Sequence, residues 1–273
     1  MNDYKIYFVP TPIGNLYDIT LRAIDVLKES DIIACEDTRE SYKLLNHYSI
    51  NKKLISYHKF NESTRSDELI QMAIAGKKIS VITDQGMPGI SDPGHVLIEK
   101  CIDKKIPYTV LPGASSILTA LVASGFDNSE FSYYGFIPKK NKDKKIYYKK
   151  LENETKTSIL LDTPHNIENT IKDFKVLFPE RKLAIARELT KIYENILIKK
   201  ISEILIDDII LKGEMVLILE GGKIKKNEIK DIEDEIKYLI KSGKKTKEIS
   251  KYLSKKTGIS TNEIYNYIIN NKL

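Results

Sequence analysis

Short apolar, β-rich segments alternate with segments of helical periodicity along most of this chain, and this alternation restricts the possible folds strongly. In the first part, the strand-like runs are 4–9, 31–35, 78–83 and 107–111, and the helix-like runs are 19–28, 68–75, 96–104 and 115–124. Strands that alternate with helices typically build a mostly parallel sheet with helices on its faces. The sequence therefore predicts an α/β fold.

A second block of alternating segments follows without a long linker. Its expected strands are 131–136, 158–161, 183–186, 195–199 and 214–220, and its expected helices are 142–153 and 166–178. After Gly221 and Gly222 the sequence becomes lysine-rich with apolar residues at helical spacing, and Ser260 with Glu263 predicts a capping box that opens a last helix. We predict two α/β domains and a small helix-turn-helix-like helical module, with the boundaries 1–112, 113–222 and 223–273.

The positive charge of the chain is concentrated in its last fifth. The formal net charge is +6, and residues 223–273 alone hold 13 lysines against 7 acidic residues. A second basic cluster lies at 139–150. Localised cationic surface suggests a polyanionic partner, with nucleic acid as the first candidate. Only five of the 44 basic residues are arginine, however, so a general bias toward lysine explains the same composition.

Several classes of protein are not supported. No apolar run approaches the ~18–20 residues of a membrane span, and the N-terminus lacks the basic and apolar regions of a secretory signal. Cys35 and Cys101 are far apart, so they indicate neither a disulfide scaffold nor a zinc site. We therefore expect a cytoplasmic protein with reduced thiols, with no membrane partner and no metal.

Four distinctive loops each follow a predicted strand. Three are rich in glycine and proline, at 9–16, 83–94 and 111–116, and the fourth, 184–191, is a strand that breaks into a charged segment. Ligands of open α/β sheets bind at the carboxyl ends of the strands, so these loops are expected to line one cleft. The first loop matches neither GxGxxG nor a Walker P-loop, which argues against an ordinary dinucleotide or nucleoside triphosphate site.

Each loop also has a purely structural interpretation. Asp92 fits an N-cap with Pro93 at the first helical position, and we favour that role over ligand binding. Ser115 and Ser116 can cap the helix that follows them. The segment 36–39, Glu-Asp-Thr-Arg, is equally consistent with a proton-handling group and with an acidic helix N-terminus.

Seven segments together carry a family resemblance, in the order VPTPIGNLYDIT, ACEDTR, TDQGMPGISDPG, VLPGASS, GFIPKK, ARELTK and GEMVLILEG. From about Tyr4 to Gly222 the chain resembles the tetrapyrrole (corrin/porphyrin) methylase superfamily, the class III methyltransferases. Within it, the chain looks like the members that methylate small-subunit ribosomal RNA. The terminal helices resemble a small helix-turn-helix module that many members carry.

The resemblance implies a fold and a reaction. The fold has two α/β domains with S-adenosyl-L-methionine, the methyl donor, in the cleft between them, and members are usually homodimers. The reaction is 2′-O-methylation of a cytidine ribose in the decoding region of 16S ribosomal RNA. We expect the RNA to be presented in an assembled 30S subunit.

The resemblance also implies functional residues when it is carried over motif by motif. It assigns cofactor binding to Pro10, Thr11, Ile13, Gly14, Asp84, Gly86, Met87, Pro88, Ile90, Ser115, Ser116, Leu161, Ala186 and Arg187. Together with the basic cluster, it predicts RNA contacts at Arg39, Lys139, Lys140, Lys142, Lys144, Lys145, Arg187 and Lys191. The candidate general bases are Asp37, Asp84 and Glu188, and the sequence does not choose among them.

The chain departs from the family pattern at a few positions. Gln85 and Met87 stand where Ala and Thr are usual, and Ala114 stands where Pro is usual. The segment 160–166 lacks the Tyr, Glu and Arg that the family carries there. These departures bring a catalytic or RNA-binding role of 160–166 into question.

Two alternatives accompany this prediction. A tetrapyrrole methylase of the same superfamily shares the donor loops, but the basic terminal module and the GFIPKK and RELTK segments favour RNA. A nucleic-acid-binding protein without catalysis leaves the four loops at strand ends without a purpose. The sequence does not show what the terminal helices contact.

Overall fold

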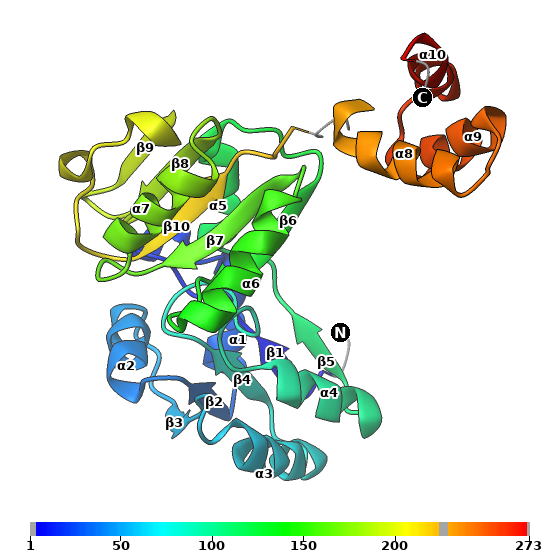
Figure 1. The fold of residues 1–273 in the computed structure, drawn as a ribbon. Helices are drawn as coiled ribbons and strands as arrows, with labels where there is room; N and C mark the ends of the chain where they lie inside the picture. Colours follow the sequence, from blue (N-terminus) through cyan, green and yellow to red (C-terminus); the bar gives the residue numbers. More distant parts are fainter. Residues whose placement is uncertain (1–3, 224–228, 272–273) are drawn as a thin grey trace. The chain divides into compact units, whose positions relative to one another are not determined.

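The computed structural model describes residues 4–223 and 229–271, except the side chain of Asp231. The chain divides into two compact units, Met1–Gly222 and Lys223–Leu273. The two sheets of the described residues lie in the first unit, and the described elements of the second unit are helical (Figure 1).

The first sheet consists of five parallel strands in the order β3-β2-β4-β1-β5. The strands are β1 (Ile6–Phe8), β2 (Ile32–Cys35), β3 (Lys53–Ser56), β4 (Ile79–Ile82) and β5 (Tyr108–Val110). One face packs against α1 (Leu21–Glu29) and α2 (Thr38–His47), and the other packs against α3 (Glu62–Ile74) and α4 (His95–Asp103). With both faces covered, β2 and β4 are buried at every residue, as their apolar sequences require.

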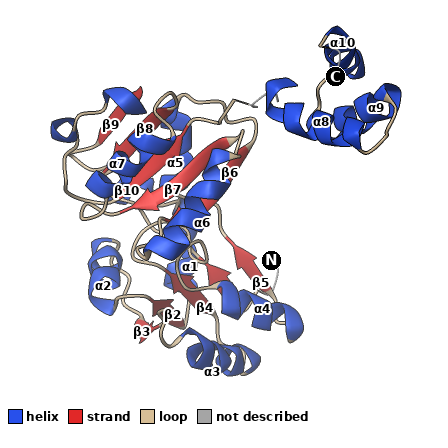
Figure 2. Cartoon of the chain, in the orientation of Figure 1, coloured by secondary structure: helices blue, strands red, loops and turns tan. Residues whose placement is uncertain are grey.

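The second sheet is mixed, in the order β6-β7-β10-β8-β9 (Figure 2). Its strands are β6 (Phe131–Phe136), β7 (Thr157–Asp162), β8 (Lys182–Arg187), β9 (Asn195–Lys200) and β10 (Met215–Leu219). On one face lies α5 (Ser116–Ser124), and on the other lie α6 (Asn141–Glu152) and α7 (Ile167–Leu177). Because β10 runs antiparallel to β7 and β8, its first residue, Met215, lies opposite their last residues, Asp162 and Arg187.

The second unit contains a 3-10 turn (Ile229–Ile232) and the helices α8 (Glu233–Lys241), α9 (Thr246–Thr257) and α10 (Thr261–Asn270). It has its own apolar core, which includes Ile236, Leu239, Ile249, Leu253, Ile264 and Ile268. The Ser260 side chain accepts a hydrogen bond from the Glu263 N–H, so the predicted start of the last helix is confirmed. The predicted fold class, α/β with a small C-terminal helical module, is likewise confirmed.

The predicted capping role of Asp92 is wrong. Helix α4 begins at His95, and its N-cap residue is Gly94, which has no side chain to accept a capping hydrogen bond. The Glu62 carboxylate of α3 instead accepts hydrogen bonds from the Gly94 N–H at 2.8 Å and from the Val96 N–H at 3.4 Å. A carboxylate from a neighbouring helix thus satisfies the orphan donors of α4 and leaves Asp92 free for another role.

Glu62→Ala is therefore expected to destabilise the first unit by about 1–2 kcal/mol, since it removes the cap of α4. The measurement is the free energy of unfolding from urea titrations. Glu68→Ala is the matched control on the same helix, because it breaks only the exposed ion pair with Arg65 and should cost less than ~0.5 kcal/mol. Equal losses in the two variants would contradict the capping role.

Candidate active site

A cavity of about 700 Å³ lies between the two sheets of the first unit. Its lining comes from the loops after β1, β2, β4 and β5, from β6, from the ends of β7 and β8, and from the start of β10. The parallel strands of the first sheet end at one edge, and the antiparallel placement of β10 adds its first residues to the ends of β7 and β8. The volume is within the range of ~300–1,000 Å³ that is typical of small-molecule sites.

Nine of the fourteen predicted cofactor-binding residues line this cavity. They are Ile13, Asp84, Gly86, Met87, Ile90, Ser115, Ser116, Leu161 and Ala186. The altered segment of the family pattern also reaches the cavity, through the residues from Leu161 to Pro164. Residues more than 170 positions apart in the sequence thus meet in one place.

Two predicted residues of the first loop, Pro10 and Thr11, do not line the cavity but contact the loops that do. Thr11 is buried and joins Gly86 through two backbone hydrogen bonds, of 2.9 Å and 3.1 Å. Its hydroxyl donates to the Thr83 carbonyl at 3.1 Å. Pro10 packs so tightly against Gly113 that a Cβ there would lie 2.7 Å from the Pro10 Cβ. The first loop is therefore fastened to the second and third loops.

Gly14 brings the first loop against the fourth. A Cβ at Gly14 would lie 2.8 Å from the Leu189 carbonyl oxygen and 2.5 Å from the Lys191 Cγ. The neighbouring Asn15 N–H donates to the Thr190 hydroxyl at 3.0 Å. The small size of Gly14 thus permits direct contact between the two halves of the first unit.

Pro88 and Arg187 do not line the cavity. Arg187 is 7% exposed, and its guanidinium donates to the carbonyls of Tyr193 at 2.7 Å and Lys212 at 3.3 Å. The Arg187 side chain thus holds neighbouring backbone. The contacts of Arg187 with donor and RNA stay predictions.

Six acidic residues line the cavity: Glu36, Asp84, Asp92, Asp162, Glu188 and Glu214. The Asp162 carboxylate accepts hydrogen bonds from the Thr163 N–H and from the Asn166 and Thr170 side chains. Burial raises the pKa of Glu36, Asp84 and Glu214. Burial, followed by repulsion from Glu36, Asp84 and Glu214, raises the pKa of Asp92 to about 7. No hydrogen bond or ion pair to the Asp92 carboxylate is found among the described residues. A carboxyl in this state exchanges a proton near neutral pH.

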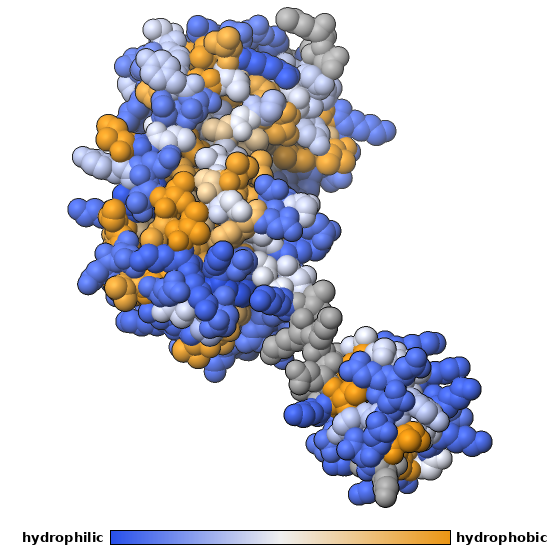
Figure 3. Space-filling view, turned by 90° about the horizontal axis from the view of Figure 1, so that it is seen from above, coloured by the Kyte–Doolittle hydropathy of each residue, from blue (hydrophilic) through white to orange (hydrophobic). Residues whose placement is uncertain are grey.

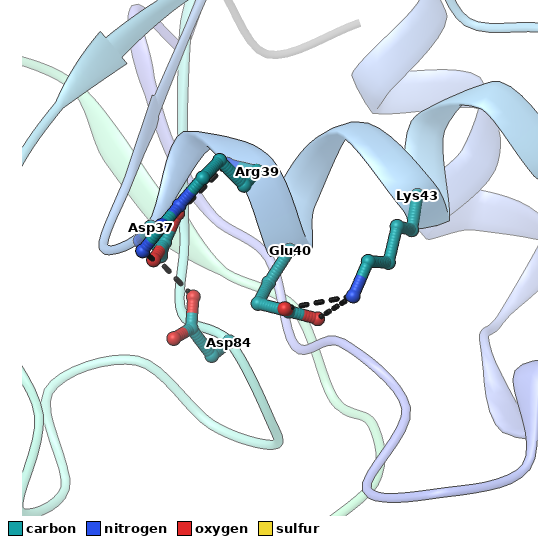
Figure 4. Close-up of polar contacts among 5 residues, drawn as sticks. All are labelled: Asp37, Arg39, Glu40, Lys43 and Asp84. Atoms are coloured by element: carbon teal, nitrogen blue, oxygen red, sulfur yellow. Dashed lines mark hydrogen bonds and ion pairs between the residues drawn. The ribbon is translucent and has the colours of Figure 1, made fainter.

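Asp37, one of the three predicted bases, has a different role. It caps α2, and its side chain forms an ion pair with Arg39 at 2.6 Å (Figure 4). Hydrogen bonds from Arg39 hold the pKa of Asp37 down, at about 2. Its N–H donates to the Asp84 carboxylate at 3.1 Å, so Asp37 positions Asp84 but does not line the cavity. The helix-start interpretation of 36–39 is therefore the correct one for Asp37.

The fourth loop holds Glu188 in a left-handed conformation, with φ of 51°. Its carboxylate accepts a hydrogen bond from the Lys191 ammonium at 3.1 Å and from the Glu214 N–H at 3.3 Å. Ser91 and Thr190 also have positive φ, at 66° and 65°. Three of the five such non-glycine residues in the described chain thus belong to the two loops beside the cavity, where strained backbone often marks a functional site.

The predicted RNA-contacting lysine Lys191 lines the cavity and is paired with Glu188. The predicted lysines of the 139–150 cluster fall into two groups. Lys144 forms an ion pair with Asp173 at 2.8 Å and keeps only 13% of its side chain exposed, so it is a structural residue. The lysines that are exposed in the loop after β6 and on α6 are Lys139, Lys140, Lys142 and Lys145. That loop begins directly after Phe136, which lines the cavity.

Sequence reasoning did not select Asp92 or Glu214 as functional residues. Glu214 directly precedes β10, and only the antiparallel pairing of β10 shows that it reaches the carboxyl ends of the other strands. The loop of Asp92 is unusually dense in glycine, proline and aspartate, which indicates a functional loop, but the position of Asp92 before Pro93 favoured a helix cap. Glu36 was part of the 36–39 segment, which was predicted either to handle a proton or to start a helix.

Two features are absent from the part of the chain that the structure describes. Among residues 4–223 and 229–271 there is no group of three or more His, Cys, Asp and Glu side chains arranged to hold a metal ion. Within the same ranges, no helix is long and apolar enough to span a membrane.

Comparison with known proteins gives close relatives. Ribosomal RNA small subunit methyltransferase I of Streptococcus pyogenes serotype M6 is 38% identical over 267 residues, which cover 95% of this chain and 93% of that protein. The protein of the same name from Bacillus subtilis is 36% identical, with 95% and 92% covered. The Vibrio cholerae protein is 42% identical over 221 residues, with 79% and 77% covered.

Solved structures show the same fold at low identity. The methyltransferase CobJ has a TM-score of 0.62 at 16% identity and covers 80% of this chain and 95% of its own. Uroporphyrin-III C-methyl transferase of Thermus thermophilus, solved with S-adenyl homocysteine, has a TM-score of 0.55 at 16% identity, with 79% and 97% covered.

The family model described as Tetrapyrrole (Corrin/Porphyrin) Methylases matches residues 5–205, which include both sheets up to β9. The matched residues include all four loops that were predicted to line one cleft. The match therefore agrees with the resemblance that the seven segments carry. The chain therefore belongs to the tetrapyrrole (corrin/porphyrin) methylase family, and within that family to the ribosomal RNA small subunit methyltransferase I proteins.

Proposed function

We propose that this protein transfers a methyl group from S-adenosylmethionine to the ribose 2′-oxygen of a cytidine in small-subunit ribosomal RNA. The observation that carries the proposal is the convergence of the four motif loops on one cavity, in a chain whose curated relatives are named for this RNA. Those relatives favour RNA over a tetrapyrrole as the acceptor.

The cavity fits the proposed donor. Apolar side chains such as Ile13, Met87 and Leu161 suit its adenine and its methylene groups, and the carboxylates of Glu36 and Asp84 suit its positive charge. The solved relative with S-adenyl homocysteine supports the same ligand class. When bound, S-adenosylmethionine supplies an electrophilic methyl group on a sulfonium. The residues of the chain must then orient the acceptor and remove its proton.

Asp92 is the best candidate for the general base. It faces the cavity without a fixed partner, and its pKa of about 7 suits proton transfer at neutral pH. Asp84 is held by the Asp37 N–H, and Glu188 is held by Lys191. Asp92 would accept the proton of the 2′-hydroxyl as the oxygen bonds to the methyl carbon and the sulfonium bond breaks.

The RNA would approach along β6 and the start of α6. Phe136 lines the cavity and is 56% exposed, so its ring offers a stacking surface for a nucleobase. The four exposed lysines that follow it would contact phosphates and make binding depend on salt.

The assembly and the setting follow from the same proposal. We expect a homodimer, because Leu118 and Val122 leave an apolar strip of α5 exposed. Size-exclusion chromatography with light scattering measures this directly. A ribosomal substrate further implies a cytoplasmic protein that acts on the assembled 30S subunit.

The decisive experiment is transfer of labelled methyl from S-adenosylmethionine to small subunits from cells that lack this protein. The RNA is then digested with alkali. A 2′-O-methyl group blocks the internal nucleophile, so label is expected in an alkali-resistant dinucleotide that contains cytidine. Donor binding without label in free RNA or subunits would point to a small-molecule acceptor, and absence of donor binding would refute the proposal.

A further inference from the structure

The second unit carries a strongly asymmetric charge. Between Ile236 and Gly258 the chain has eight lysines and one acidic residue, Glu248. The acidic residues Glu233, Asp234 and Glu235 instead fill the first turn of α8, where they interact favourably with the helix dipole. The acidic end thus has a local structural reason, and the lysines need a separate explanation.

Two of these lysines are paired within the unit. Lys237 contacts Glu233 and Lys256 contacts Glu235, each at 2.6 Å. The other six are exposed and have no carboxylate partner among the side chains that the structure describes: Lys241, Lys244, Lys245, Lys247, Lys251 and Lys255. Figure 3 shows mostly hydrophilic residues on the visible face of this unit.

Three of the unpaired lysines form a row along α9. Lys247, Lys251 and Lys255 are spaced four residues apart, so each lies ~6 Å further along one side of the helix. The buried residues Ile249 and Leu253 occupy the opposite side and pack into the core. The lysine row therefore points away from the core of its own unit.

Stability gives no reason for this row. Like charges at this spacing destabilise a helix by ~0.2–0.5 kcal/mol per pair. A polyanion with regularly spaced charges would remove the repulsion, and successive phosphates of a nucleic-acid strand are separated by a similar interval. Tyr252 lies beside the row, is 48% exposed and has the Lys244 ammonium 5.4 Å from its ring centroid. Cationic and aromatic groups of this kind suit a nucleic-acid strand.

The charge is on the first helix of the helix-turn-helix pair. Helix α10, which follows the turn at Gly258, contains no lysine or arginine and one glutamate, Glu263. A basic second helix that reads bases in a groove, as in many helix-turn-helix proteins, is therefore absent from the described α10. The arrangement favours contact with the backbone over recognition of a base sequence.

We propose that α9 and the turn before it form an RNA-docking face, which binds the phosphate backbone of ribosomal RNA through Lys244, Lys247, Lys251 and Lys255 without reading its sequence. The proposal rests on RNA being the acceptor in the proposed function. It assigns the second unit to substrate capture, whereas the cavity of the first unit carries out the chemistry.

The test uses the full chain and small-subunit ribosomal RNA transcribed in vitro, with the dissociation constant measured over a range of salt concentrations. The variant K244Q/K247Q/K251Q/K255Q is expected to reduce the slope of log affinity against log salt by about 3, since each lost phosphate contact contributes ~0.7–0.9. Its affinity at low salt should fall at least ~10-fold. The corresponding Lys→Arg variant should bind as the wild type does.

A matched pair of double variants controls for net charge. K251Q/K255Q removes two unpaired lysines, and K237Q/K256Q removes the two that are paired with glutamates. Only K251Q/K255Q should reduce the slope of log affinity against log salt. Circular dichroism should show unchanged helix content in both double variants. Equal effects of the two pairs, or an unchanged slope in the fourfold variant, would overturn the proposal.

Methyl transfer is measured in parallel so that the two proposals can fail separately. If the wild type methylates ribosomal RNA but the fourfold variant keeps its full salt slope, the docking face is refuted and the proposed function stands. If the wild type binds RNA through α9 but transfers no methyl group, the proposed function fails. If the K244Q/K247Q/K251Q/K255Q variant loses binding to subunits but keeps binding to naked RNA, the partner of α9 is a ribosomal protein, and RNA docking is refuted.

Discussion

Asp92→Asn is expected to lower kcat for methyl transfer by about 10²–10⁴-fold and to change the shape of the pH profile. The wild-type rate should rise with pH and level off above about 7, because burial and the surrounding carboxylates raise the pKa of Asp92 to about 7 and only the ionised form accepts a proton. The variant should lose this acidic limb. Single-turnover rates between pH 5.5 and 9 measure both effects.

Although Asp92→Asn should lower kcat, it should raise the free energy of unfolding at neutral pH. The pKa of Asp92 is higher in the folded chain than its ordinary value of 3.8, so the folded state binds more protons than the unfolded state between about pH 4 and pH 7. Wild-type stability should therefore fall across this window as pH rises. Asp92→Asn lacks this loss and should be more stable than the wild type above pH 7, with little difference below pH 4.

Asp37→Asn is the control for this prediction. Asp37 is ion-paired with Arg39, has a pKa of about 2 and does not line the cavity. Its substitution should remove the ion pair with Arg39, keep the cap of α2, and keep the limb near pH 7. A variant of Asp92 that retains the limb, or a variant of Asp37 that removes it, would exclude Asp92 as the base.

The parts of the fold that local pattern determines were predictable. Strands β6 and β10, the helices α6 and α7, and the cap at Ser260 all follow from apolar periodicity and turn residues within a few positions. The start of helix α2 was one of two open interpretations of 36–39, and strand β3 was not predicted. Helix α2 buries only a few residues of a polar sequence, and β3 is a short edge strand that is largely unburied, so the periodic signal of both is weak.

The parts of the site that depend on distant contacts were not predictable. Asp92 was expected to cap α4, but the donors of α4 are taken by Glu62, which precedes Asp92 by 30 residues. Arg187 was expected at the donor, and its hydrogen bonds to the backbone of Tyr193 and Lys212 were not predicted. The motifs thus identified the loops that form the cavity. The role of each residue within a loop depends on contacts with distant residues, which only the folded chain provides.

Gly86→Val is expected to weaken binding of S-adenosylhomocysteine by about 10–100-fold, or ~1.4–2.7 kcal/mol. Gly86 has φ of 77°, which a β-branched residue strongly disfavours, and its new Cβ would lie 3.3 Å from the Ile13 side chain. The loop has little room to relax, because both backbone groups of Gly86 bond Thr11. A shift would therefore move the first and second loops together. Isothermal titration calorimetry measures the affinity.

Gly76→Val separates this local effect from general strain. Gly76 has φ of 90° and lies at the end of α3 outside the cavity, and a Cβ added there would meet no other atom within 4 Å. Gly76→Val should lower the free energy of unfolding by ~1–3 kcal/mol through the same kind of backbone strain. It should leave the affinity for S-adenosylhomocysteine unchanged. Equal losses of affinity would attribute the effect to the fold as a whole. Full affinity in Gly86→Val would mean that the paired first and second loops do not hold the donor, and the cavity would then need another ligand.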